Sequence, residues 1–127
     1  MRAKSGHIVF SEKTEYKHLA PVFEEVMLTF LKESKQTVED PEYLEMLVKL
    51  NIEYLERNQK PEGYNRPGKM RLIFPIRTDG CVEMYIMGLG LSVETVRVTE
   101  LLCSILNTHS LDHDIFWDDM PKKEDLL

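Results

Sequence analysis

The residues with the most suggestive chemistry lie between His109 and Asp119. His109 and His113 stand four apart, so they would share one face of a helix that continued through them. Asp112 or Asp114 could then add an oxygen ligand, and a zinc, manganese or iron ion held in this way can activate water. No Glu follows His109, so the run differs from the metalloprotease pattern. A small metal-assisted hydrolase using His109, Asp112 and His113 is one hypothesis; the simpler interpretation is a solvated acidic turn without metal.

The same segment also has the composition of a binding surface. Ile115, Phe116 and Trp117 are set among aspartates. Large aromatic side chains ringed by charge are typical of binding anchors, and acidic neighbours steer a basic partner. We therefore expect partner contacts from Asp112, Asp114, Phe116, Trp117, Asp118 and Asp119. The alternative is that both aromatic rings fold back and cover the core.

Other catalytic patterns are weak. No Gly-x-Ser-x-Gly elbow occurs, and the adjacent pairs Glu24-Glu25 and Asp118-Asp119 point in different directions on regular structure. Cys81 and Cys103 are interpreted as two buried free thiols, which suits a reducing compartment. We expect a protein that is not an enzyme and that needs no cofactor.

Two glycine-containing runs suggest further hypotheses. The run from Gly90 to Val96 (GLSVETV) resembles the turn and recognition-helix start of helix-turn-helix regulators of the response-regulator type. The resemblance implies DNA binding through residues 90–98; a strand end, a glycine turn and a serine cap explain the run equally well. The loop from Lys60 to Arg71, with Tyr64, could bind a small anion or could be a mobile solvated loop.

Charge narrows the class of partner. The chain has 127 residues and a formal charge of −6, and residues 77–127 carry the whole excess, with ten acidic side chains against four basic ones. An acidic half repels phosphate backbones and anionic lipid heads and attracts basic proteins. Nucleic acid and membrane are therefore poor partners. No run approaches the roughly 18 apolar residues of a membrane span, and no signal peptide is recognised, so we expect a cytoplasmic protein.

Periodicity predicts the elements that must position these residues. Apolar side chains recur at helical spacing after Pro21, after the Asp40-Pro41 start and again between residues 93 and 106. Residues 70–76 and 81–89 read as strands of a β-hairpin around the Asp79-Gly80 turn, and residues 7–10 read as a short first strand.

These elements predict a single small α+β domain. A helical hairpin and a third helix would pack on a small antiparallel sheet that contains the β-hairpin near residues 70–89. Residues 1–110 would form the domain, and residues 111–127 an acidic C-terminal extension. The function expected is that of a small acidic inhibitor, immunity protein or regulatory adaptor that binds a basic protein. The oligomeric state is left open.

Overall fold

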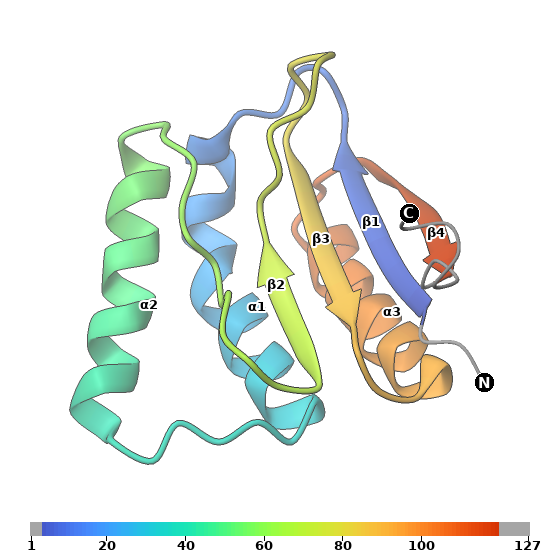
Figure 1. Cartoon of the computed structure of the whole chain (residues 1–127). Helices are drawn as coiled ribbons and strands as arrows, with labels where there is room; N and C mark the ends of the chain where they lie inside the picture. Colours follow the sequence, from blue (N-terminus) through green and yellow to red (C-terminus); the bar gives the residue numbers. More distant parts are fainter. Residues whose placement is uncertain (1–3, 120–127) are drawn as a thin grey trace.

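The fold is α+β, as the sequence predicts. A computed structural model describes residues 4–119, which form a four-stranded antiparallel sheet with helices on one face (Figure 1). In chain order the elements are β1 (Lys4–Phe10), a 3₁₀ turn η1 (Tyr16–Leu19), α1 (Ala20–Glu33), α2 (Pro41–Glu56), β2 (Met70–Ile73), β3 (Glu83–Gly88), α3 (Ser92–Thr108) and β4 (His113–Asp119).

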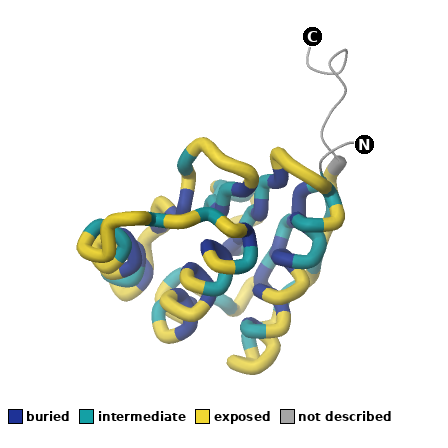
Figure 2. The backbone as a smooth tube through the Cα atoms, turned by 90° about the horizontal axis from the view of Figure 1, so that it is seen from below, coloured by how far each residue is buried: buried dark blue, intermediate teal, exposed yellow. Residues whose placement is uncertain are grey.

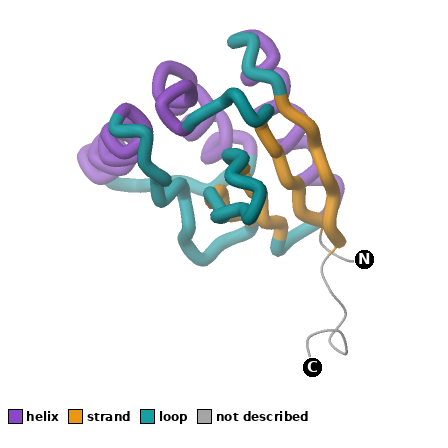
Figure 3. Tube along the Cα trace, turned by 90° about the horizontal axis from the view of Figure 1, so that it is seen from above, coloured by secondary structure: helices purple, strands orange, loops and turns teal. Residues whose placement is uncertain are grey.

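The strand order is β2-β3-β1-β4, and every neighbouring pair is antiparallel. β3 is therefore inserted between the parallel strands β1 and β2, and β1 between the parallel strands β3 and β4, as in split β-α-β units. The helical crossovers lie on the same side, so α1 and α3 cover one face of the sheet (Figures 1 and 3). Within residues 4–119 no helix covers the opposite face, which we call the open face.

The β-hairpin near residues 70–89 is confirmed, with shorter strands than predicted. β2 and β3 pair from Met70↔Gly88 to Ile73↔Tyr85, and residues 74–82 leave the sheet between them. Pro75 lies in this connection, where its missing N–H removes no ladder bond. Gly80 takes a φ of +80°, which suits the Asp-Gly turn.

The core lies between the sheet and the helices, and α1 buries the face that its sequence predicts (Figure 2). On α2, the apolar side chains of Leu50 and Tyr54 are each 45% exposed, while the polar Asn51 is buried. On α3, Leu101 is 37% exposed and Thr99 is fully buried. Thr99 packs closely against β1, where an added Cβ on Gly6 would lie only 2.7 Å from Thr99 Cγ2.

The predicted acidic extension is in part a strand of the sheet. All seven residues of β4 pair with β1, from Phe10↔His113 to Lys4↔Asp119. Alternate side chains of β4 turn toward the helices, and Ile115 packs against the core. The domain therefore runs at least to Asp119, and the rest of the expected extension lies outside the described residues.

A buried amide fixes the long connection from α2 to β2. Asn51 Oδ1 accepts a hydrogen bond from Gly63 N at 2.7 Å, and Asn51 Nδ2 donates to Gly63 O at 3.3 Å. Gly63 has a φ of +72°, and the next residue, Tyr64, exchanges two backbone hydrogen bonds with Leu72. This loop is therefore anchored at both α2 and β2.

Gly63 and Gly80 allow a matched test of this anchoring. A Cβ at Gly63 would lie 2.2 Å from Leu72 O, whereas a Cβ at Gly80 would meet nothing within 4 Å. We expect Gly63→Ala to lower the free energy of unfolding by roughly 3 kcal/mol or more, because it adds a backbone clash to an unfavourable φ. Gly80→Ala should lose only about 1–2 kcal/mol, from φ alone. Urea unfolding of both variants measures the difference, and equal losses would contradict the proposed close packing.

Candidate functional site

Exposed and half-buried side chains alternate along the acidic strand β4. Asp112, which precedes the strand, and Asp114, Phe116 and Asp118 within it are exposed, whereas Ile115 is half-buried. Phe116 leaves 56% of its surface exposed, which is high for a large apolar side chain in a sheet. Four of the six predicted partner-binding residues therefore share one side of an edge strand.

The other two predicted residues do not join this group. Trp117 is half-buried on the helix side, where its Cζ3 atom would lie 3.0 Å from a Cβ on Gly6. Lys4 Nζ lies 5.8 Å from the centre of the Trp117 ring, within reach of a cation–π interaction. The backbone of Asp119 pairs with Lys4, while its side chain lies outside the described part. Of the two predicted aromatic residues, Phe116 is therefore the one that is available to a partner.

Strand register places Phe116 in a row across the open face. Ile73 pairs with Tyr85, Tyr85 with His7, and His7 with Phe116. The His7 and Tyr85 rings are stacked, with centroids 4.4 Å apart and planes 7° from parallel. The open face thus carries a continuous band of one aliphatic, two aromatic and one imidazole side chain from β2 to the outer edge.

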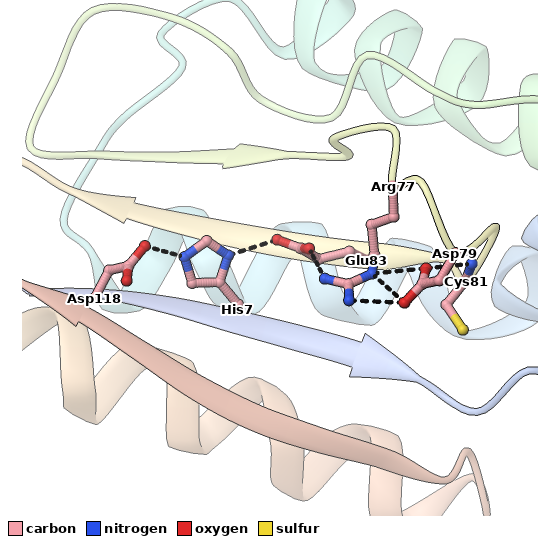
Figure 4. Close-up of polar contacts among 6 residues, drawn as sticks. All are labelled: His7, Arg77, Asp79, Cys81, Glu83 and Asp118. Atoms are coloured by element: carbon pink, nitrogen blue, oxygen red, sulfur yellow. Dashed lines mark hydrogen bonds and ion pairs between the residues drawn. The ribbon is translucent and has the colours of Figure 1, made fainter.

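His7 joins three strands through carboxylates. Its Nδ1 atom lies 2.6 Å from Glu83 Oε2 on β3, and its Nε2 atom lies 2.6 Å from Asp118 Oδ2 on β4 (Figure 4). Both contacts are hydrogen bonds donated by the ring when both nitrogens carry a proton, as in the imidazolium cation. His7 thereby lies between Glu83 and Asp118 and ties the edge strand to the centre of the sheet.

Arg77 extends this row of polar contacts. Its Nη1 atom donates to Glu83 Oε1 at 2.7 Å, and its Nη2 atom donates to Asp79 Oδ2 at 2.8 Å (Figure 4). The hydrogen bonds from Arg77, helped by the backbone N–H of Cys81, lower the pKa of Asp79 from 3.8 to about 2. The hydrogen bond from Arg77 to Asp79, and then the one to Glu83, raise the pKa of Arg77. The side chain of Glu83, which is only 4% exposed, is thus contacted by the Arg77 guanidinium and by the imidazole of His7.

Negative charge remains unpaired at the outer edge. Residues 98–119 contain no lysine or arginine, and within residues 4–119 no ion pair involves Asp112 or Asp114. Asp118 differs, because it contacts His7. Asp112, Asp114 and Asp118 are therefore gathered on one edge of the sheet, and Asp112 and Asp114 keep their charge open to solvent.

The predicted metal cluster does not assemble. α3 ends at Thr108, so His109 lies just beyond the helix and His113 begins β4, and they share no helix face. His109 Nε2 lies 3.4 Å from Glu25 Oε1, while His113 Nδ1 contacts Leu111 O at 2.8 Å. No group of three or more His, Cys, Asp or Glu side chains suited to a metal is found among the described residues.

Residues 90–98 do not form a helix-turn-helix. The strand β3 precedes the glycine turn, so the first helix of that motif is missing from this position. Arg97, the basic residue within this range, donates to Glu33 Oε1 at 2.8 Å and to Glu94 Oε2 at 3.0 Å. The structure therefore has a strand end, a turn and a helix start here, but the expected serine cap is wrong, because Leu91 is the N-cap and Ser92 is the first residue of α3.

Two other predictions concern the Lys60–Arg71 loop and the cysteines. Arg66 Nε and Arg71 Nε are buried without a hydrogen-bond partner among the described residues, and Cys81, unlike Cys103, is only half-buried. In the Lys60–Arg71 loop, Tyr64 is buried, Arg66 lies 5.0 Å from the centre of the Tyr43 ring, and Arg71 donates to Asn65. Cys103 is a buried free thiol, and burial raises its pKa to about 11, which leaves little thiolate at neutral pH.

A groove between α1 and α2 is a feature that the sequence reasoning missed. It has a volume of about 510 Å³, and its apolar lining includes Leu28, Val48 and Ile52. Its lining also includes the glutamates Glu24, Glu45, Glu53 and Glu56 and one lysine, Lys49. The available signal was the broad apolar stripe of α2, which is wider than a single buried face requires.

None of the helices in residues 4–119 has the length and apolarity needed to cross a membrane. Comparison of the chain with protein-family models, with curated proteins and with solved structures found no match.

The salt bridge between Arg77 and Asp79 predicts a pH dependence. Because the folded pKa of Asp79 is about 2, below the ordinary 3.8, its stabilising contribution is fully present above pH 4 and is lost as pH falls toward 2. NMR titration of the Asp79 carboxyl should give a midpoint near 2, and Arg77→Met should return it toward 3.8. Arg97→Met, which removes a distant arginine, should leave it unchanged. A native midpoint near 3.8 would contradict this ion pair.

Proposed function

We propose that the protein is a non-enzymatic binding module that takes a basic segment of another protein at the outer edge of its sheet. The observation that carries the proposal is the exposure of Asp112, Asp114 and Phe116 on one side of β4. Together they combine unpaired negative charge with an apolar anchor.

Electrostatics supports a cationic partner. Asp112 and Asp114 lie in a 22-residue stretch, residues 98–119, without lysine or arginine. A concentrated negative field accelerates the approach of a basic protein and is screened by salt over about 10 Å at 0.1 M. The contribution to affinity is smaller, at about 0.2–1 kcal/mol for each exposed ion pair.

Phe116 would contribute hydrophobic binding free energy, which salt does not screen. More than half of its surface is exposed, at 56%, although it is flanked by His7 in the next strand. Full burial of a phenylalanine side chain contributes about 1.5–3 kcal/mol. An apolar partner side chain placed over Phe116 would thus add affinity comparable to that of two or three exposed ion pairs.

Small size, net charge and unpaired acids suit an inhibitor, an immunity protein or a regulatory adaptor; we propose this group of functions without choosing among them. The free thiols Cys81 and Cys103 accord with a reducing compartment, and we propose the cytoplasm.

The test uses a defined probe, the peptide acetyl-Lys-Thr-Leu-Thr-Lys-Thr-Lys-amide, called here the basic peptide. Two-dimensional NMR titration at low salt should shift the amide signals of β4. The double variant Asp112→Asn/Asp114→Asn should weaken binding about 2- to 30-fold, for two exposed ion pairs of about 0.2–1 kcal/mol each. The affinity of this variant for the basic peptide should also depend less on salt concentration.

The control carries the same loss of charge elsewhere. Glu45→Gln/Glu53→Gln removes two acids from the α1–α2 groove and should leave the affinity for the basic peptide within about twofold, because these acids line a different surface. If the groove variant loses affinity and the β4 variant does not, the proposed site is wrong and the groove is the binding surface.

A further inference from the structure

Among the described residues, 4–119, the main-chain groups on the outer edge of β4 have no partner strand, and they follow a regular order. Ser11 N donates to Asp112 O at 3.1 Å, whereas Phe10 N donates away from β4, to Val82 O on the other side, at 2.9 Å. Peptide groups alternate in direction along antiparallel strands. Asp114, Phe116 and Asp118 therefore direct their N–H and C=O groups toward β1, and His113, Ile115 and Trp117 direct theirs outward.

These outward groups lie at the end of the sheet. β4 is the last strand in the order β2-β3-β1-β4, and within residues 4–119 no further strand pairs with it. The three alternate residues His113, Ile115 and Trp117 supply three outward N–H donors and three outward C=O acceptors at the spacing of a β-ladder. A free edge of this kind is a template for an added strand.

We propose that the basic partner binds by strand addition, which extends the sheet beyond β4 to a fifth strand. This inference rests on the proposed function, and it specifies how the partner is held: main-chain hydrogen bonds to His113, Ile115 and Trp117, with side chains read by Asp112, Asp114 and Phe116.

Charge decides between a partner strand and a second copy of this chain. Antiparallel pairing of two β4 strands would bring the aspartates of both copies onto one small area of the open face. Like charges directly opposite one another destabilise a strand pair, whereas opposite charges stabilise it. The occupant that fits is therefore a strand with lysine or arginine at alternate positions.

The register of β4 also fixes the expected sequence pattern. Residues directly opposite in a strand pair share a face of the sheet. An antiparallel partner therefore places a basic residue opposite Asp118, an apolar residue opposite Phe116, and basic residues opposite Asp114 and Asp112. The basic peptide follows this pattern, and its threonines oppose Trp117, Ile115 and His113.

Backbone methylation of the basic peptide tests strand addition without altering its charge. N-methylation of the central threonine, which opposes Ile115, removes a donor aimed at β4 and should weaken binding by at least about tenfold. N-methylation of the lysine that follows, which opposes Asp114, alters an N–H aimed at solvent and should leave binding within about threefold. The unmodified peptide should also slow hydrogen exchange at the amides of His113, Ile115 and Trp117.

The possible outcomes separate the two proposals. If both methylated peptides bind as tightly as the unmodified one, strand addition is overturned while the binding function at β4 stands. If the unmodified peptide causes no shift in β4 at low salt, both proposals fail. If the three outward amides become protected as the concentration of the protein alone is raised, the edge belongs to a second copy, and strand addition by a basic partner is again overturned.

Discussion

The pairing of β4 with β1 is the constraint on which the candidate site depends. It extends over seven residues and converts an acidic segment into a rigid strand, in which side chains on one face stand about 7 Å apart. The same pairing assigns Asp114 and Phe116 to the open face and Ile115 to the helix side. Without it the aspartates would be a flexible run of charge, able to attract a basic protein but unable to impose a register on it.

The ionic network across the open face reinforces this pairing. His7 lies between Glu83 of β3 and Asp118 of β4, so one imidazole connects the centre of the sheet with its edge. Glu83 is almost fully covered, and a buried carboxylate is tolerated only when cations and hydrogen bonds satisfy it. Arg77 and His7 together supply them. Asp118 is thereby occupied in holding the strand, which leaves Asp112 and Asp114 as the aspartates free to meet a ligand.

Strong local sequence signals, such as a helix cap or a periodic apolar pattern, predicted the corresponding helices well. Asp40 caps α2, accepting hydrogen bonds from the backbone of Glu42 and Tyr43, and the periodic apolar residues of α1 are buried as expected. The strand β4 was missed because aspartate disfavours strands and because its partner, β1, lies at the other end of the chain. Tertiary pairing overrides that preference.

The candidate site was only partly predictable for the same reason. Alternation along β4 could have separated Phe116 from Trp117 once a strand was assumed. The network of His7 could not be found in this way, since its two contacts span 76 and 111 residues of sequence. The metal and DNA-binding hypotheses depended on helices continuing through His113 and preceding Gly90, and the structure has a strand at each of those places.

The short turn between α3 and β4 acquires an unexpected importance from this arrangement. Alternate side chains of a strand face opposite sides of the sheet. The length of the turn at residues 109–112 therefore determines which residues of β4 lie on the open face. One residue gained or lost there would exchange the two faces of β4, presenting isoleucine and tryptophan to solvent and turning aspartate inward. The length of this turn should therefore be less free to drift during evolution than the identity of the residues within it.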